Sequence, residues 1–241
     1  LADVFTQLAA GDNQVLVTTH SPLFVNGDGV ENVRLVRTTT GDAGSSVSSV
    51  KFGDLCVSIR EAMGEDPARK LEGLVAKIHQ ALQPHIAEMF FSRIPILVEG
   101  LEDASYITAA LHLTGKWLEF RRLGCHLVPV NGKDKLIQPV AIAQQLRVPI
   151  FVVFDADGNT ERPEHRVKHE KDNKALMKLL GVPGNAFPDA DYLGGHCAIW
   201  KTNLTLVVEG DFGDSCSTYK EKAKPRVADT SNNERSACWQ F

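Results

Sequence analysis

Two runs of apolar residues in this sequence end abruptly in carboxylates. The first run leads into Glu99, Gly100 and Asp103, and the second leads into Asp155 and Asp157. Four carboxylates at two strand ends repel one another unless positive charge lies between them. Mg²⁺ and Mn²⁺ prefer oxygen ligands, whereas these acids lack the thiolate or imidazole neighbours typical of a zinc site. The acids therefore predict a site for a hard divalent cation.

Both acidic motifs follow segments that should form buried strands. Residues 94–98 and 148–154 are rich in Val, Ile and Phe, which is typical of strands buried on both faces of a parallel sheet. Ligands bind at the carboxyl ends of such strands. Asp155 and Asp157, two positions apart, can project to the same side of a strand end. For either motif alone, simple capping of a turn or helix explains the acids equally well, but the pair together favours a shared site.

The pair of motifs resembles the Toprim domain, the catalytic fold shared by topoisomerases, bacterial primases and several nucleases. In that family a hydrophobic strand ends in Glu-Gly, with an Asp four positions after the Glu, and a later strand ends in Asp-x-Asp. Between the two motifs, residues 125–130 predict a strand, 131–133 its loop and 134–145 a helix. The resemblance covers about residues 93–210. It implies an α/β fold with a central, mostly parallel sheet flanked by helices.

The N-terminal end of the sequence adds a second resemblance. Residues 14–22 predict an apolar strand that ends in Thr-His-Ser-Pro, with the end of an amphipathic helix before it. This segment looks like the last conserved motif of ABC-type ATPases, in which the histidine, here His20, reaches the γ-phosphate of ATP. Two Gly-Lys dipeptides, at 115–116 and 132–133, do not fit the phosphate-loop template G-x-x-x-x-G-K-[ST]. We therefore expect ATP to bind only with a missing N-terminal domain, leaving His20 as an orphaned contact.

An ATPase end followed directly by a Toprim domain resembles the OLD (overcoming lysogenization defect) family of nucleases, as does the junction at residues 88–93. The resemblance implies metal-dependent endonuclease cleavage of DNA by two Mg²⁺ or Mn²⁺ ions, coupled to the ATPase in the full-length protein. It further implies DNA repair or phage defence in the bacterial cytoplasm, and it leaves room for a helicase-type partner protein and a full-length homodimer. The alternatives are a non-catalytic Toprim module that binds DNA and an ATP-switched regulatory module.

The resemblance also gives each acid a role in displacement at phosphorus, with two ions about 3.5–4 Å apart. One ion would be held by Glu99, Asp103 and Asp155, and the other by Asp157 and Glu209. Residues 204–209 predict a strand that ends in Glu209, which is why this acid is chosen as the additional ligand found in OLD-type sites. Asp211 is the fallback for that position.

OLD-type sites also place a lysine near the scissile phosphate, C-terminal to the acids. A positive charge there would offset the charge of the pentacovalent transition state. Lys220 is the catalytic lysine of this interpretation, and Lys222 and Lys224 are alternatives that the sequence does not separate from it.

The chain divides into four expected parts. They are the end of an ABC-type ATPase domain (1–50), a helical segment (51–93), the Toprim catalytic domain (94–215) and a charged C-terminal segment (216–241). Within the helical segment, Pro84 should kink or split the helix.

The charge balance does not by itself favour a nucleic-acid partner. The chain has 26 Lys and Arg against 30 Asp and Glu, which gives a formal net charge of −4. Basic residues do gather after the predicted strands, at Arg121, Arg122, Lys133, Lys135, Arg162, Arg166, Lys168, Lys171 and Lys174. A DNA-binding face and a mixed-charge surface both explain the group at 162–174, because acids alternate with its bases. His165 and His169 in that group are expected to be solvated instead of binding zinc.

Two further features of composition bear on the cellular setting. The five cysteines follow no pattern, which predicts free thiols in a reducing compartment. The sequence contains no apolar run of 18 residues, so no membrane association is expected.

Overall fold

A computed structural model describes residues 2–10, 12–27, 29–38, 44–66, 72–214 and 217–218. Its centre is a five-stranded sheet with the strand order β4-β3-β5-β7-β6. The strands are β3 (Ile94–Val98), β4 (Cys125–Pro129), β5 (Phe151–Asp155), β6 (Tyr192–Leu193) and β7 (Cys197–Trp200). All neighbouring pairs are parallel except β6 and β7, so the sheet has one antiparallel edge. The predicted α/β fold with a mostly parallel sheet is thus confirmed.

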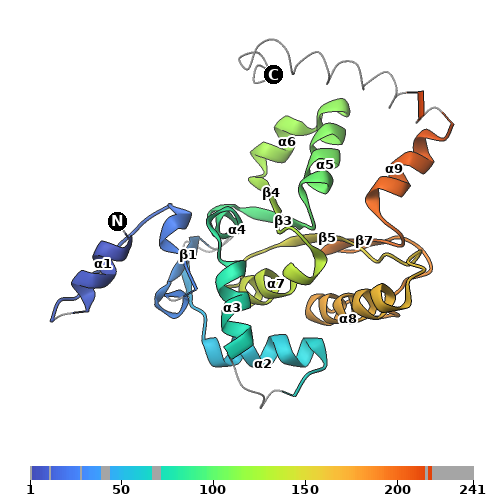
Figure 1. Ribbon diagram of the computed structural model, residues 1–241. Helices are drawn as coiled ribbons and strands as arrows, with labels where there is room; N and C mark the ends of the chain where they lie inside the picture. Colours follow the sequence, from blue (N-terminus) through green and yellow to red (C-terminus); the bar gives the residue numbers. More distant parts are fainter. Residues whose placement is uncertain are drawn as a thin grey trace, which may run out of the picture.

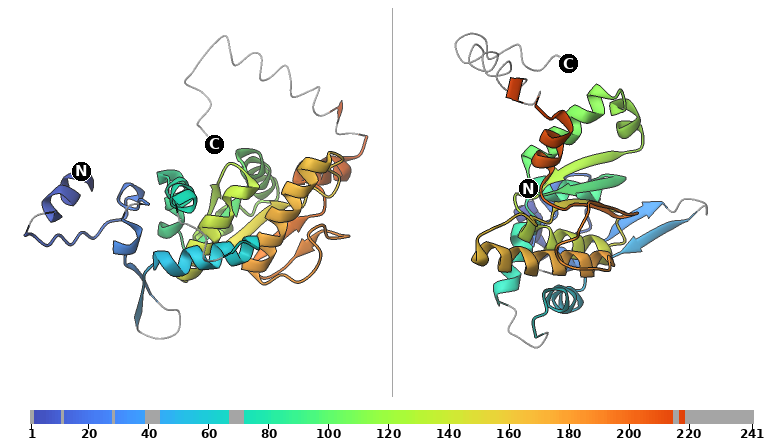
Figure 2. Two further views of the ribbon diagram at one scale, coloured as in Figure 1. Left: turned by 60° about the horizontal axis from the view of Figure 1, so that its bottom comes forward. Right: turned by 90° about the vertical axis from the view of Figure 1, so that its right-hand side faces the viewer.

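Helices cover both faces of this sheet (Figure 1). One face carries α5 (Leu101–Leu113), α6 (Trp117–Arg122) and α9 (Leu204–Phe212), and the other carries α2 (Phe52–Met63), α7 (Ile137–Gln145) and α8 (Pro163–Leu180). Beside this second layer, α3 (Glu72–Ala81) contacts α7, and α4 (Pro84–Ala87) contacts β4. The two views of Figure 2 show the same three layers. Since β3 and β4 are each followed by a covering helix, the chain returns after each of them to begin the next strand in parallel.

Side chains along the strands alternate between two apolar clusters of unequal size. On β3, Leu97 joins the large cluster formed with α2, α3, α7 and α8, whereas Ile96 and Val98 join the small cluster on the α5 side. On β5, Val152 and Phe154 likewise point to the large cluster, opposite to Phe151 and Val153. This alternation is the two-residue period of a strand with both faces covered. The parallel register of β3 and β5 brings the two acidic motifs that follow them to one edge of the sheet.

The helical segment before the sheet shares the large cluster. Leu55 and Ile59 of α2, together with Ile78 of α3, are fully buried in it. Pro84 divides the predicted helix as expected: Gln83 is extended, and Pro84 takes the first position of α4, where a proline lacks no needed amide. A single-turn helix, η3 (Glu88–Phe91), then leads into β3.

The N-terminal residues are not part of the five-stranded sheet (Figures 1 and 2). They form α1 (Ala2–Ala9), two single-turn helices, η1 (Pro22–Phe24) and η2 (Val30–Asn32), and an antiparallel pair of β1 (Leu35–Thr38) and β2 (Ser45–Ser48). The strand predicted for residues 14–22 is wrong, because this segment belongs to no sheet of the described chain and Leu16 is 95% exposed. A strand needs a partner for its backbone hydrogen bonds, and none of the described segments pairs with this one.

No helix of the part of the chain that the structure describes has the length and apolar character needed to span a membrane.

Candidate metal and nucleic-acid site

Glu99 and Asp155 meet at the carboxyl edge of the sheet. The backbone amide of Asp155 donates a 2.7 Å hydrogen bond to Oε1 of Glu99. This bond continues the ladder between β3 and β5, so the Glu99 carboxylate takes the place of the next backbone carbonyl. The first acid of each predicted motif is therefore fixed relative to the other by the sheet itself.

Asp103 lies in the first turn of α5, as predicted. Its Oδ2 accepts a 2.8 Å hydrogen bond from the amide of Gly100, so the side chain reaches back over the turn that follows β3. The positive end of the helix dipole also stabilises a carboxylate at this position. Asp103 thus caps the helix, and its negative charge also raises the pKa of Asp155.

Asp155 and Asp157 are held by the segment that follows β7. The amide of Leu204, at the start of α9, donates to Oδ1 of Asp155 at 3.1 Å, and Asp157 N donates to Thr202 O at 2.9 Å. Asp157 has a φ of 53°, an uncommon left-handed conformation for a residue with a side chain. At the next position, a Cβ on Gly158 would lie 2.8 Å from the carbonyl oxygen of Lys201. The acids therefore depend on a close approach of two loops.

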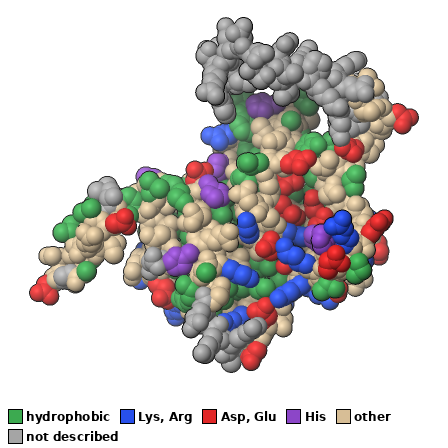
Figure 3. Space-filling model, viewed as in Figure 1, with side chains coloured by type: hydrophobic (Ala, Val, Ile, Leu, Met, Phe, Trp, Pro, Cys, Tyr) green, Lys and Arg blue, Asp and Glu red, His purple; other side chains and the backbone are tan. Residues whose placement is uncertain are grey.

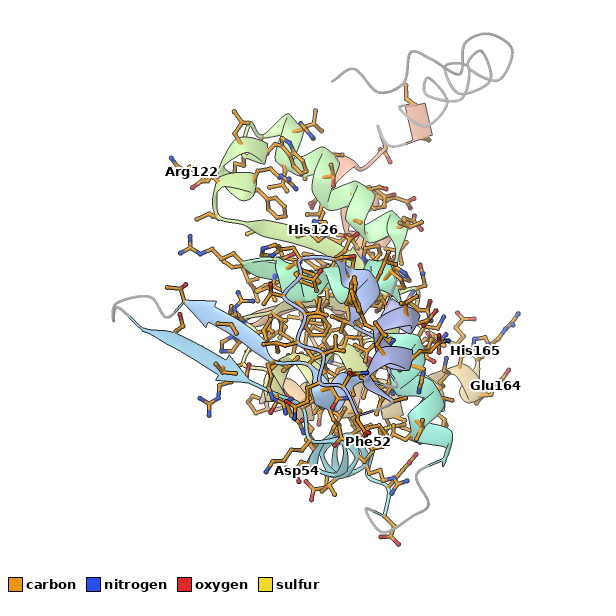
Figure 4. All side chains as sticks on the ribbon, turned by 90° about the vertical axis from the view of Figure 1, so that its left-hand side faces the viewer. Phe52, Asp54, Arg122, His126, Glu164 and His165 are labelled. Carbon is orange, nitrogen blue, oxygen red and sulfur yellow. The ribbon has the colours of Figure 1, made fainter. Side chains whose placement is uncertain are left out.

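Two residues that the sequence interpretation did not assign to the site contact Asp157. The Nζ of Lys133 lies 2.6 Å from Oδ2 of Asp157 and donates to Asp155 O at 2.5 Å. The Nδ1 of His169, on α8, lies 3.1 Å from the same Oδ2. Only a quarter of the His169 side chain is exposed, so the prediction that it is solvated is wrong. His165, one turn earlier, is exposed as predicted and points outward in Figure 4.

In the sequence, Lys133 is marked only by its place after Asn131 and Gly132, in the loop that follows a predicted strand. In the structure these two residues have φ values of 63° and 135°, in the loop after β4. In the strand order, β4 and β5 flank β3, so a long side chain from this loop can cross the end of β3 to reach the end of β5. The amide of Gly132 donates to Glu99 O at 2.8 Å and fixes that crossing.

The electrostatics of the site follow from burial of several like charges. Burial raises the pKa of Glu99 to about 8, and the charge of Lys133 opposes this rise. Burial also raises the pKa of Asp155 to about 7, and the negative charge of Asp103 adds to the effect. The pKa of Asp103 is raised by burial as well. The negative charges of neighbouring acids also raise the pKa of Glu99 and of Asp155, so these acids lie close enough to interact.

The other predicted site residues lie as follows. The strand predicted for residues 204–209 is wrong, because this segment is the helix α9: Asn203 caps it by accepting from the amide of Leu206 at 2.9 Å, and this local cap overrides the β-branched composition. Glu209 and Asp211 therefore lie on a helix.

His20 lies in the extended N-terminal segment, and its ring is 6.4 Å from the ring of Phe91. Because Phe91 precedes β3, His20 lies towards the edge of the sheet opposite to the acids.

The predicted catalytic lysine, Lys220, and its alternatives Lys222 and Lys224 lie outside the described residues.

Much of the basic group on α8 is engaged with other protein groups. Arg166 stacks over the Phe187 ring at 4.2 Å and donates to Gly158 O at 3.2 Å. Lys168, Lys171 and Lys174 lie 3.6, 2.8 and 2.5 Å from the carboxylates of Asp134, Glu65 and Glu170 respectively. Figure 3 shows acidic side chains gathered at the centre of one face, with Lys, Arg and His side chains beside them. This pattern favours the mixed-charge interpretation for these lysines.

The donor set suits a hard divalent cation. It consists of carboxylates without thiolates. Burial raises the pKa of Glu99 to about 8 and that of Asp155 to about 7, so a bound cation would stabilise the ionised form of both acids. Within the described ranges, no group of three or more His, Cys, Asp or Glu side chains already has the arrangement to hold an ion. Each carboxylate instead accepts a hydrogen bond from the protein itself. The donors are the Asp155 amide for Glu99, the Leu204 amide for Asp155 and the Lys133 ammonium for Asp157.

The mostly parallel sheet, its flanking helices and the acids at its carboxyl edge define a Toprim-type α/β domain. Residues 90–157 match the model of the Toprim domain of overcoming lysogenization defect (OLD) protein-like sequences. This part of the chain is an OLD-like Toprim region, which confirms the resemblance drawn from the two acidic motifs. The match supports a metal-binding module that acts on nucleic acids. No curated protein matches the chain.

Proposed function

We propose that this chain cleaves DNA phosphodiester bonds with divalent metal, Mg²⁺ or Mn²⁺, at the carboxyl edge of its sheet. The observation that carries the proposal is the meeting of Glu99 and Asp155, two acids from separate strands, with Asp103 and Asp157 beside them. Buried carboxylates that raise one another's pKa have a cost in stability, and such clusters concentrate at functional sites. The match to an OLD-like Toprim region supports a role of that cluster in the chemistry of phosphate esters.

When bound, the metal would supply an activated water and stabilise charge on the leaving oxygen. Glu99, Asp103 and Asp155 would hold one ion, and Asp157 would hold the other with Glu209 as the proposed further ligand. The chain's own groups fix the positions of Glu99 and Asp155 before any metal or substrate binds, whereas Asp157 is held by Lys133. The β3–β5 ladder sets Glu99 against Asp155, and the first amide of α9 sets the rotamer of Asp155. Such preorganisation lowers the reorganisation that charge development would otherwise require.

Further parts of this proposal rest on the resemblance alone. Coupling to ATP would need a domain that completes the site to which His20 belongs. Lys220 would offset charge at the scissile phosphate. A role in DNA repair or phage defence, a helicase-type partner and a homodimeric full-length form belong to the same proposal, as does a bacterial cytoplasmic setting.

The test is conversion of supercoiled plasmid by the chain with Mg²⁺, Mn²⁺, Ca²⁺ or EDTA. Asp155→Asn is the decisive variant, because asparagine keeps an oxygen that can accept from the Leu204 amide while removing the charge. Glu164→Gln is the matched control, since Glu164 is exposed on α8 and points away from the fold (Figure 4). We expect Mg²⁺- or Mn²⁺-dependent nicking that is lost in Asp155→Asn and kept in Glu164→Gln. Equal nicking by all three proteins would refute the assignment.

A non-catalytic module that binds DNA is the second candidate. The observation that favours it is the contact between Lys133 and Asp157, which leaves the acids already neutralised in part by the protein. An ATP-switched regulatory module shares this prediction of no cutting. DNA binding that is retained in EDTA, with no cleavage under any metal, would support this candidate over the nuclease.

A further inference from the structure

Lys133 is an unusual residue for this site because it is buried and charged. Its side chain is 4% exposed, and lysine is among the residues least often buried unless paired. Removing an ammonium from water is costly, and close, well-aligned partners must offset that cost. Lys133 has two: Oδ2 of Asp157 at 2.6 Å and the carbonyl oxygen of Asp155 at 2.5 Å.

The loop that carries Lys133 is built to deliver it to this position. Asn131 and Gly132 both adopt positive φ, and the Gly132 amide is tied to Glu99 O at 2.8 Å. The chain then enters the single-turn helix η4 (Lys133–Lys135). The end of β3, which carries Glu99, therefore also fixes the direction of the Lys133 side chain. The fold of this loop thus places the ammonium within the acid cluster.

The ammonium also acts on more than its direct partner. Its charge lowers the pKa of both Glu99 and Asp155 against the larger opposing effect of burial. It shares Oδ2 of Asp157 with His169, whose Nδ1 lies 3.1 Å away. A single positive charge thus lies among three carboxylates, the position that electrostatics would give to a metal ion.

We propose that Lys133 is an internal cation that competes with divalent metal for Asp157. The inference rests on the proposed metal site. It goes beyond that site because it assigns to Lys133 a role in controlling how tightly the metal binds. In the metal-free protein the ammonium holds Asp157 and limits repulsion within the cluster. Metal that binds through Asp157 must displace this ammonium, so Lys133 lowers the metal affinity of the site.

The direction in which metal affinity changes when Lys133 is replaced distinguishes competition from a simple supporting role. If Lys133 only held Asp157 in place for metal, its removal would weaken metal binding. If it competes, removal of its charge strengthens metal binding, because Asp157 no longer exchanges one cation for another. The two roles predict opposite changes in a quantity that does not depend on catalysis.

The experiment is calorimetric titration of the whole chain with Mn²⁺, without DNA. Lys133→Gln is the first variant, because glutamine can still donate to Asp155 O or Asp157 while carrying no charge. Lys133→Met is the second, and it removes the donor as well. Lys116→Met is the matched control, since it removes one lysine charge at the start of α6, at the far end of α5 from the acids. Circular dichroism and thermal unfolding establish that each variant is folded.

We expect Lys133→Gln to bind Mn²⁺ more tightly by on the order of tenfold, as one nearby unit charge is removed, while Lys116→Met binds like the wild type. Unchanged or weaker binding by folded Lys133→Gln, in the presence of clear binding by the wild type, would overturn the competition and leave the proposed nuclease standing. Absence of Mn²⁺ binding in the wild type and both Lys133 variants would instead overturn the metal site on which both proposals depend.

Discussion

The amide of Asp155 donates a 2.7 Å hydrogen bond to Oε1 of Glu99, although the two residues are 56 positions apart in the sequence. The bond explains how these two acids are positioned relative to one another. It fixes the carboxylate of Glu99 at the end of the β3–β5 ladder, where the carboxyl group is largely removed from water. The backbone donor offsets part of the resulting cost, and burial still dominates the pKa of Glu99. The stability of the metal-free protein should therefore report directly on the site.

The first prediction concerns pH. The pKa of Glu99 rises from 4.5 to about 8, and that of Asp155 rises from 3.8 to about 7, so the folded state binds more protons than the unfolded state between these values. Stability from such groups is fully present below about pH 4 and is lost as pH rises through about 7 to 8. We expect the free energy of unfolding in EDTA, measured with urea, to fall between pH 5 and pH 8.5. A curve that is level or rises across this window would contradict the burial of these acids.

The second prediction concerns Glu99→Gln. Glutamine keeps an Oε1 that can accept from Asp155 N, and it removes the buried carboxyl group. At pH 8 in EDTA the variant should be more stable than the wild type by about 1–3 kcal/mol, after discounting for partial exposure and for the lost attraction to Lys133. The gain should shrink towards pH 5, and Mn²⁺ should no longer raise the melting temperature. Glu164→Gln, exposed on the same protein, should show neither effect; a gain of equal size there would assign it to net charge.

The acids could be placed from the sequence because strand ends are local features. An apolar run that stops at a carboxylate defines the end of a buried strand, and parallel order brings two such ends together. This reasoning correctly predicted the carboxyl-edge positions of Glu99 and Asp155 and the position of Asp103 in the first turn of α5. The same reasoning failed for residues 204–209, where an apolar, β-branched run is the helix α9. There the cap provided by Asn203 decided the conformation.

Lys133 and His169 escaped prediction for a different reason. Their roles depend on how far a side chain reaches across neighbouring elements, and neither residue belongs to a local pattern that demands burial. His169 lies among charged residues on a helix whose neighbour His165 is exposed, so only the packing of α8 distinguishes the two. The strand prediction for residues 14–22 was wrong because a strand depends on a partner strand, and no described segment supplies one.

The third prediction concerns the loop contact beneath Asp157. A Cβ at Gly158 would lie 2.8 Å from the carbonyl oxygen of Lys201, which is backbone and yields little. Gly158→Ala should lower the free energy of unfolding by about 1–3 kcal/mol, because the loop must move or the 2.9 Å hydrogen bond from Gly158 N to Lys201 O must lengthen. Gly195→Ala is the control, since a Cβ there meets nothing within 4 Å. Equal stability of the two variants in urea titrations would show that the loop adapts without cost.

The last prediction concerns Asn173, whose side chain is 0% exposed beneath the acidic motif. Its Nδ2 donates at 2.9 Å to the carbonyl oxygens of Ala156, between the two acids, and of Ala186, in the loop after α8. Asn173→Ala leaves both carbonyls without this donor and should cost about 2–4 kcal/mol in urea titrations. Because Ala156 is then less firmly held, Mn²⁺ affinity should also fall. The control is Asn185→Ala, an exposed position in that loop. A destabilised Asn173→Ala that binds Mn²⁺ as the wild type does would show that Asn173 supports the fold without positioning the acids.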